Sequence, residues 1–174
     1  VSGTSDLAPL TTQAQMMIDT LSLAEGDKVG LLYCSAEPNS QYQVDTVQAE
    51  LEALGYTCTQ YAFADSNDLQ AVAQKAVAES DVVYVPTDNT LASAAGIVND
   101  VCSAAGIPVI AGEEGICAGC GVATLSISYY DLGVKTGKMA AQILSGEADI
   151  AEMEISYADN FTKKYNAALC DALG

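Results

Sequence analysis

Short apolar runs alternate with helix-length amphipathic segments from one end of the chain to the other. The expected strands are residues 28–34, 56–63, 82–85, 108–111 and 121–127, with one more at 151–156. The expected helices are residues 7–23, 39–54, 68–79, 90–105, 130–144 and 159–173. About five strand–helix units with short connections predict an α/β fold. Right-handed crossovers would place helices on both faces of one doubly wound, mostly parallel sheet.

Length and composition favour one domain with a sizeable core. The chain has 174 residues, of which 50% are apolar, so we expect residues 1–174 to form a single α/β lobe. No apolar stretch approaches the roughly 18 residues that a membrane-spanning helix needs. Residues 1–6 carry neither a positively charged nor an apolar segment, so we expect no signal peptide in this sequence. Its abrupt start indicates a piece of a longer protein.

The charge balance excludes several classes of partner and chemistry. Asp and Glu total 23 against 6 Lys and Arg, which gives a formal net charge of -17. Phosphate backbones and anionic membranes repel such a chain, so we expect no nucleic-acid partner and no lipid partner. The chain also has no histidine, which excludes Ser-His-Asp catalysis and His-ligated metal sites. We therefore expect no histidine-dependent catalysis and no His-ligated metal, and nothing in the sequence indicates a cofactor.

Five loops follow expected strands, at residues 35–40, 64–67, 86–89, 112–115 and 128–131. The carboxyl ends of parallel strands share one edge of a sheet, so these loops should converge where open α/β sheets bind ligands. In one of them an apolar strand ends at Pro86, and Thr87, Asp88 and Asn89 precede an Ala-rich helix. All three side chains can cap that helix, and Asp88 can also pair with a cation such as an α-amine. Spacing alone leaves both roles open.

A neighbouring loop offers the opposite charge preference. Asn39 or Ser40 can cap the helix that follows the first strand, and backbone N–H groups at its N-terminus would accept a carboxylate. A plain cap is the simpler interpretation of this loop taken by itself. Glu113 and Glu114 add negative charge after the fourth strand, although at least one of them is expected to be solvated surface. Together with Asp88, the helix N-terminus matches the two charges of an amino-acid zwitterion.

The six cysteines are too few and too scattered to predict a disulfide scaffold. Cys117 and Cys120 form a C-x-x-C motif, which in redox proteins lies at a helix N-terminus that stabilises the thiolate. Here we expect the motif in a Gly-rich loop that leads into a strand. A local disulfide or two free thiols is therefore favoured over catalysis. Two cysteines without a histidine also cannot complete a zinc site.

Several segments occur in an order that resembles a known family. They are Val29–Ser40, with Glu-x-Asn-Ser after a strand, Asp81-x-x-Tyr-Val-Pro-Thr-Asp-Asn-Thr90, Ile107-Pro-Val109 and Tyr129-Tyr-Asp-Leu-Gly-x-x-Thr-Gly-Lys-Met139. These segments resemble the substrate-binding proteins of ABC importers in the tryptophan/tyrosine-type group, which have the type I periplasmic-binding fold. The resemblance extends over nearly the whole chain. The cysteines within Glu113–Cys120 depart from the family pattern, in which Ser and Asp residues lead to a Gly.

The resemblance implies two α/β lobes, joined by a hinge, that close over the ligand. This chain resembles the second lobe together with a returning terminal strand and helix at residues 151–174. Residues 1–6 then correspond to a hinge-like crossing from a first lobe that the sequence lacks. The cleft residues that the resemblance implies are Glu37, Asn39, Ser40, Thr87, Asp88 and Asn89. With Glu113, these are the candidate ligand-binding residues.

The function implied is a non-catalytic lobe of an extracytoplasmic solute receptor, periplasmic or anchored as a cell-surface lipoprotein. Its partners would be an aromatic or related small amino acid and the membrane permease of an ABC importer. One alternative is a ligand-sensing lobe of a regulator with the same fold. The other is a thiol oxidoreductase that uses Cys117 and Cys120.

Overall fold

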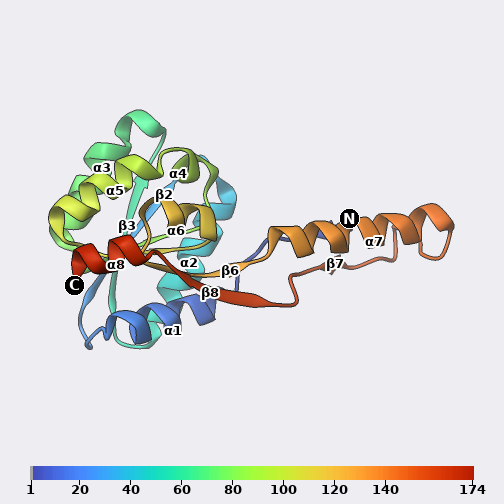
Figure 1. The fold of residues 1–174 in the computed structure, drawn as a ribbon, viewed down its shortest axis with the longest axis horizontal. Helices are drawn as coiled ribbons and strands as arrows, with labels where there is room; N and C mark the ends of the chain where they lie inside the picture. The colour runs from blue at the N-terminus through green and yellow to red at the C-terminus, as the bar shows by residue number, and fades with distance from the viewer. Residues whose placement is uncertain (1) are drawn as a thin grey trace.

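A computed structural model describes residues 2–174, so Val1 of the expected hinge-like segment lies outside the described residues. The strands are β1 (Gly3–Thr4), β2 (Lys28–Cys34), β3 (Thr57–Phe63), β4 (Val82–Val85), β5 (Val109–Ala111), β6 (Ala123–Ile127), β7 (Ile155–Ser156) and β8 (Phe161–Tyr165). The helices are α1 (Leu10–Leu21), α2 (Pro38–Ala53), α3 (Ser66–Glu79), α4 (Asn89–Ser93), α5 (Ala95–Ala105), α6 (Glu114–Cys120), α7 (Tyr129–Ser145) and α8 (Ala167–Leu173). Figure 1 shows their arrangement.

The main sheet has six strands in the order β3-β2-β4-β5-β6-β8. The first five run parallel, and β8 adds an antiparallel edge beside β6. Strand β2 is central, and all its residues after Lys28 are buried, as expected for a parallel strand covered on both faces. The prediction of a doubly wound, mostly parallel α/β sheet is confirmed.

Helices cover both faces of this sheet, with α1 and α2 on one side and α3 and α5 on the other (Figure 1). Alternate residues of β2 point to opposite faces, which divides the core into two clusters. Leu31 and Tyr33 pack with α1 and α2, whereas Leu32 and Cys34 pack with α3 and α5. The two-residue period of a strand explains this division. The sheet is therefore held rigidly between its helices, and its loops have a firm support.

Two segments of the chain differ from the secondary structure that the sequence predicts. The expected Gly-rich loop at 113–120 is the helix α6, because the Glu113 carboxylate caps it and Ile116, Cys117 and Cys120 are buried. The expected helix at 159–173 is strand β8 followed by α8. Pairing with β6 holds residues 161–165 extended, and Asn166 then caps α8.

Two other elements are shorter or interrupted. The expected helix at 90–105 breaks at Ala94, whose φ of -119° and ψ of 18° separate α4 from α5. The expected strand at 151–156 is reduced to Ile155–Ser156. It leaves the main sheet and pairs in parallel with β1.

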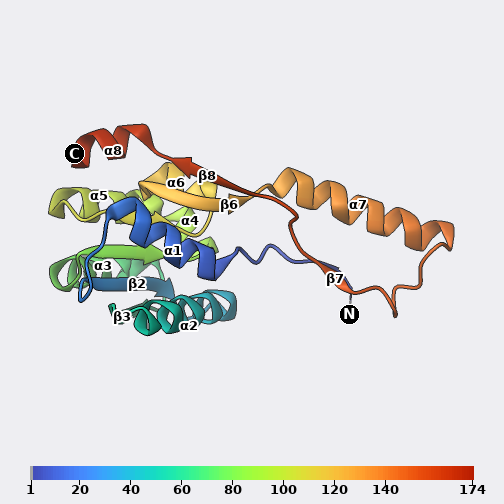
Figure 2. The same cartoon turned by 90° about the horizontal axis from the view of Figure 1, so that it is seen from below.

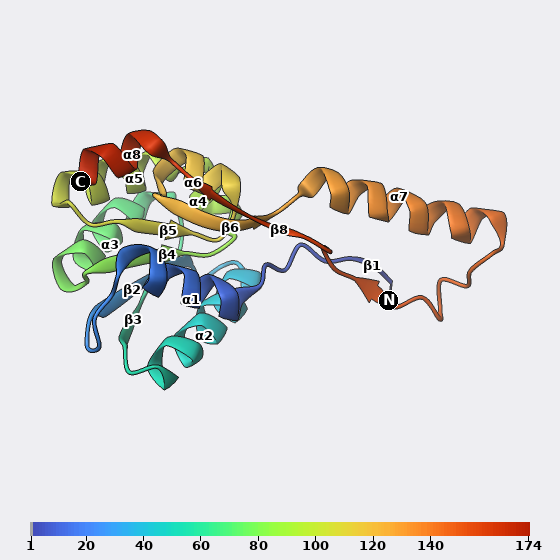
Figure 3. The same cartoon turned by 60° about the horizontal axis from the view of Figure 1, so that its bottom comes forward.

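Residues 129–160 form an arm that projects from the main sheet, with α7 as its longest element (Figures 2 and 3). Only Leu132 of the 17 residues of α7 is buried. Large apolar side chains stand exposed along the arm, among them Tyr130 at 80%, Leu144 at 88% and Ile150 at 56% exposure. None of the helices in the described part of the chain is long and apolar enough to span a membrane.

Candidate functional site

The loops that follow the parallel strands meet at one edge of the sheet and enclose a shallow cleft. The cleft consists of two adjoining hollows of about 370 and 360 Å³. Both hollows are lined by Asp6, Asn39, Thr87 and Asn89. Tyr42 and Gln43 complete the first hollow, and Asp88, Glu113 and Tyr129 are among the residues that complete the second. We call this double hollow the rim cleft.

The rim cleft brings together Asn39, Thr87, Asp88, Asn89 and Glu113 of the seven residues that the sequence singles out. Glu37 and Ser40 lie beside the cleft without lining it. The Ser40 hydroxyl is fully buried, and no described residue forms a hydrogen bond with it.

Glu37 crosses from the start of α2 to the start of α4. Its carboxylate accepts hydrogen bonds from the backbone N–H groups of Asn89 and Thr90, at 3.0 and 2.8 Å, and from both of their side chains. Burial by itself would raise the pKa of Glu37, but the hydrogen bonds from Thr90 and Asn89 prevail and lower it to about 2. Glu37 is thus a charged clamp that fixes the position of Asn89.

Asp88 caps the same helix from inside the protein. Its side chain is buried, with 2% of the residue exposed. One carboxylate oxygen accepts from Leu91 N at 2.9 Å, and the other accepts from Cys34 N at 2.9 Å. Burial raises the pKa of Asp88 despite these hydrogen bonds. With both oxygens engaged by backbone N–H groups, this geometry favours a capping role over direct contact with a ligand.

Thr87 is held in place by side chains from α2. The Gln43 side chain forms two hydrogen bonds with the Thr87 backbone: it accepts from Thr87 N at 3.0 Å and donates to Thr87 O at 3.0 Å. The Asn39 amide donates to the same carbonyl at 3.1 Å. The loop before α4 is therefore fastened to the first turns of α2. Residue spacing gave no sign of the role of Gln43, because a glutamine on a helix is usually solvated.

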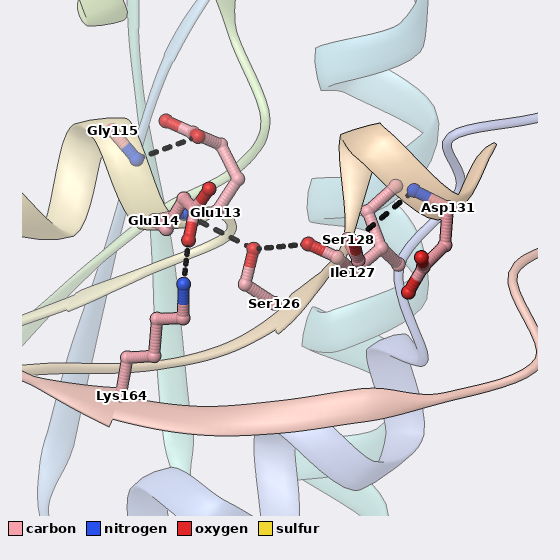
Figure 4. A network of polar contacts seen from close by, with 8 residues as sticks. All are labelled: Glu113, Glu114, Gly115, Ser126, Ile127, Ser128, Asp131 and Lys164. Carbon is pink, nitrogen blue, oxygen red and sulfur yellow. Dashed lines mark hydrogen bonds and ion pairs between the residues drawn. The ribbon is translucent and has the colours of Figure 1, made fainter. Parts of the chain in front are cut away.

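Glu113 caps the first turn of α6, as Asp88 caps that of α4. Its carboxylate accepts from Gly115 N at 2.7 Å and from Ile116 N. Figure 4 shows the neighbouring Glu114 turned the other way, toward an ion pair with Lys164 of β8. Of the two acids, only Glu113 lines the rim cleft.

One of the helices that follow the parallel strands has no side-chain cap. Five helices follow these strands, and Asp65, Asp88, Glu113 and Ser128 cap the first turns of α3, α4, α6 and α7. The 16-residue helix α2 begins at Pro38, and its N-cap residue Glu37 makes no side-chain capping hydrogen bond. Pro38 has no N–H, and Ser40 N and Gln41 N donate to Glu37 O. The Asn39 N–H at the positive end of the helix dipole is therefore the group of this first turn that remains for an anion in the rim cleft.

Asp6, Tyr42 and Tyr129 are among the residues of the rim cleft that were not candidates from the sequence. Asp6 directly precedes the helix expected at 7–23, but α1 begins later, at Leu10, and Asp6 is exposed in both hollows. Tyr42 lines one hollow and Tyr129 the other, and their side chains are partly exposed, at 57% and 42%. The loop that contains Tyr129 was expected at this edge, but no local pattern marks the individual side chains, because their roles depend on how distant loops meet.

The C-x-x-C motif lies in a setting that suppresses thiol reactivity. Cys117 and Cys120 occupy the C-terminal half of α6, each is 3% exposed, and both are free thiols. Burial raises the pKa of Cys117 to about 11 and that of Cys120 to about 12. A redox-active thiol needs a lowered pKa, so the site does not favour the oxidoreductase alternative. Among the described residues, no group of acids and thiols is arranged to hold a metal ion.

Comparison with known proteins places this architecture in context. A family model described as ABC transporter substrate binding protein matches residues 1–174. The tyrosine-binding protein of Clostridioides difficile (strain R20291) is 33% identical over 148 residues, which make up 85% of this chain and 42% of that protein.

Solved structures give the same result. An ABC domain from Streptococcus pneumoniae in complex with L-Trp matches with a TM-score of 0.90 and 29% identity, over 100% of this chain and 59% of that one. A ligand-free, open substrate-binding protein with adhesive properties from Clostridium difficile matches with a TM-score of 0.77 and 32% identity, over 100% and 58%. The chain thus spans less than two thirds of the length of these relatives. A LacI-family regulator from Bifidobacterium animalis matches with a TM-score of 0.67 at 15% identity, over 92% of this chain and 61% of that one, and shows the fold alone.

Proposed function

The chain belongs to the family of ABC transporter substrate-binding proteins, and on that premise we propose that it forms one lobe of a receptor for a small amino acid. The observation that carries this proposal is the rim cleft, in which an uncapped helix N-terminus faces carboxylates across a shallow hollow. This family is one of binding proteins, and the proposed role involves no catalysis.

The ligand class follows from the two ends of the rim cleft. The N-terminus of α2 would receive the ligand's carboxylate, because the Asn39 N–H and the positive end of the helix dipole favour an anion there. Tyr42 and Tyr129 would border the ligand's side chain, and aromatic rings prefer offset or edge-on contact with other rings. The relatives named for tyrosine and bound to L-Trp support an aromatic amino acid.

The predicted site residues would then fall into two groups. Asn39, Thr87, Asn89 and Glu113 line the rim cleft and would face the ligand. Glu37, Ser40 and Asp88 would act from behind it by fixing the loops. This division keeps every candidate residue and changes the role first expected for Asp88.

A second lobe would complete the site. The rim cleft is open on one side, whereas small-molecule sites usually bury most of the ligand. The arm exposes a row of apolar side chains along α7, which a neighbouring domain would cover. We place a first lobe there, with Gly3–Thr4 paired to Ile155–Ser156 at the crossing between the lobes. Closure over the rim cleft would exclude water from the charged contacts.

The receptor would act outside the cytoplasm, as its family does, and would deliver its ligand to a membrane permease. The LacI-like match supports only a shared fold, so the regulator alternative has no comparable support. The dispersed negative charge of the chain also disfavours direct contact with nucleic acid.

Isothermal titration calorimetry of the full-length protein against a panel of amino acids tests the proposal. We expect micromolar or tighter binding of an aromatic amino acid, and weak or undetectable binding by residues 1–174 alone. The amide of the preferred amino acid lacks the carboxylate charge and should bind much more weakly. A full-length protein that binds no amino acid would refute the proposed function, and equal binding of acid and amide would refute the role of α2.

A further inference from the structure

We propose that Asp6 receives the α-ammonium group of the ligand, and that this contact makes the rim cleft select amino acids over their deaminated analogues. This inference rests on the proposed function and assigns the second charge of the zwitterion. The sequence suggested Asp88, in the loop before α4, as the partner of the ammonium group. The proposal assigns that role to Asp6, in the segment between β1 and α1.

The other acids at the rim cleft are already engaged. Asp88 accepts backbone hydrogen bonds with both oxygens and is 2% exposed. Both oxygens of Glu113 accept from the first turn of α6. Glu37 is saturated by Asn89 and Thr90 and does not line the cleft. An ammonium group that approached any of these would compete with an existing cap.

Asp6, in contrast, caps no helix. It lines both hollows, its side chain is exposed, and it accepts no hydrogen bond from any other described residue that the structure records. Asn39 also lines both hollows. If the ligand's carboxylate lies at the start of α2, beside Asn39, the ammonium group on the same α-carbon lies in the hollows that Asp6 also lines. Adjacent positive and negative groups in one cleft match the short separation of the two charges in an amino acid.

The backbone around Asp6 is anchored on both sides. Ser5 N donates to Ser156 O at 2.8 Å, and Leu7 N donates to the Ser5 hydroxyl at 3.3 Å. Downstream, Ala8 is buried against the α1 face of the sheet. The carboxylate is thus presented from a crossing segment whose backbone is held in place, which reduces the entropy lost on binding.

The electrostatic surroundings favour a cation at this point. Tyr129 lies close to Asp6 and Glu113, and burial together with their charges raises the pKa of its hydroxyl to about 12. No lysine lines either hollow in the described part of the chain. The nearby Lys164 is paired with Glu114 outside the cleft. A ligand ammonium group would therefore meet uncompensated negative charge.

The test is a cycle that changes both protein and ligand. Calorimetry on the full-length protein compares the preferred amino acid, L-tryptophan or L-tyrosine, with its deaminated analogue, 3-indolepropionate or 3-(4-hydroxyphenyl)propionate. The wild type should prefer the amino acid by about 30-fold or more, as expected for a desolvated charge contact. Asp6→Asn should lose about 30-fold in affinity for the amino acid and little for the analogue, so that the preference nearly disappears.

One matched substitution separates this role from a general loss of charge or of fold. Asp100→Asn removes one charge from an exposed residue on α5. It should retain the preference for the amino acid, and Asp6→Asn should melt at the wild-type temperature. The inference is overturned if Asp6→Asn binds the amino acid within about threefold of wild type, or if Asp100→Asn loses the preference to the same extent. A wild type that binds no amino acid refutes the proposed function instead.

Discussion

Gln13 on α1 makes three hydrogen bonds inside the core of the fold. Its side-chain amide donates to Gly112 O and to Leu125 O, both at 2.8 Å, and accepts from the Tyr84 hydroxyl at 2.8 Å. The residue is fully buried. These contacts join α1 to strands β4 and β6 and to Gly112, which lies in the loop after β5 at the edge of the rim cleft. Gln13 therefore links the stability of the core to the shape of the site.

The cost of losing these contacts can be worked out group by group. Gln13→Leu keeps the side-chain volume nearly constant, so no large cavity opens. It leaves two carbonyls and one hydroxyl without this partner, and each unsatisfied buried group costs about 1–3 kcal/mol. Carbonyls retain a second lone pair for other donors, which favours the lower part of that range. We expect a loss of about 4 kcal/mol in the free energy of unfolding, out of the ~5–15 kcal/mol typical of a domain.

Equilibrium urea unfolding measures this loss. Gln15→Leu on the same helix is the matched control, because Gln15 is exposed and bonds only Asp19, and it should change stability by less than about 0.5 kcal/mol. Tyr84→Phe removes the hydroxyl that Gln13→Leu leaves without an acceptor. In the Gln13→Leu background it should therefore cost at least about 1 kcal/mol less than in the wild type. A Gln13→Leu protein within about 1 kcal/mol of wild type would refute the reasoning, because the three groups would then have found other partners.

Three further outcomes follow from the same contacts. Glu37→Gln should lose about 1 kcal/mol at neutral pH after solvent screening. Because folding lowers the pKa of Glu37 from about 4.5 to about 2, the wild type should lose this stability as the pH falls through that window, and the variant should not. Gly112→Ala should cost about 2–3 kcal/mol and weaken ligand binding, because its Cβ would lie 2.5 Å from Thr87 N; unchanged stability in urea would contradict this. In a native thiol titration, the exposed Cys170 should react before the buried Cys117 and Cys120, and a fast reaction at Cys120 would reopen the redox alternative.

The strand positions were predictable because burial on both faces leaves a continuous apolar signature. Runs such as Val82–Val85 have no competing interpretation, and the structure confirms them. Where the prediction was wrong, tertiary contacts overrode local composition. The glycines near residue 119 suggest a loop, but a carboxylate cap and buried side chains stabilise α6. The tail at 161–165 is extended only because β6 offers an unpaired edge.

The candidate site was predictable as a place but not as a set of roles. The rule that loops gather at the carboxyl ends of parallel strands located Asn39, Thr87 and Asn89 at one cleft. It could not distinguish an acid that faces a ligand from an acid that caps a helix, because both stand at the same sequence position relative to a strand. Asp6 escaped notice for the converse reason, since it approaches the cleft from a segment outside the strand–helix units.

The side-chain caps at this edge would restrict where an anion can bind in the proposed site. Several helix N-termini point toward this edge, and without caps each would attract a carboxylate or a phosphate. Asp65, Asp88, Glu113 and Ser128 occupy four of them, whereas the first turns of α1 and α2 have no cap from their N-cap side chains. Of these two, the start of α2 lies beside Asn39 in the rim cleft, so an anionic group would be favoured there and repelled by the surrounding acids elsewhere. On this argument, the excess of negative charge at the rim restricts where a ligand's carboxylate can bind, and it leaves Asp6 to select the opposite charge.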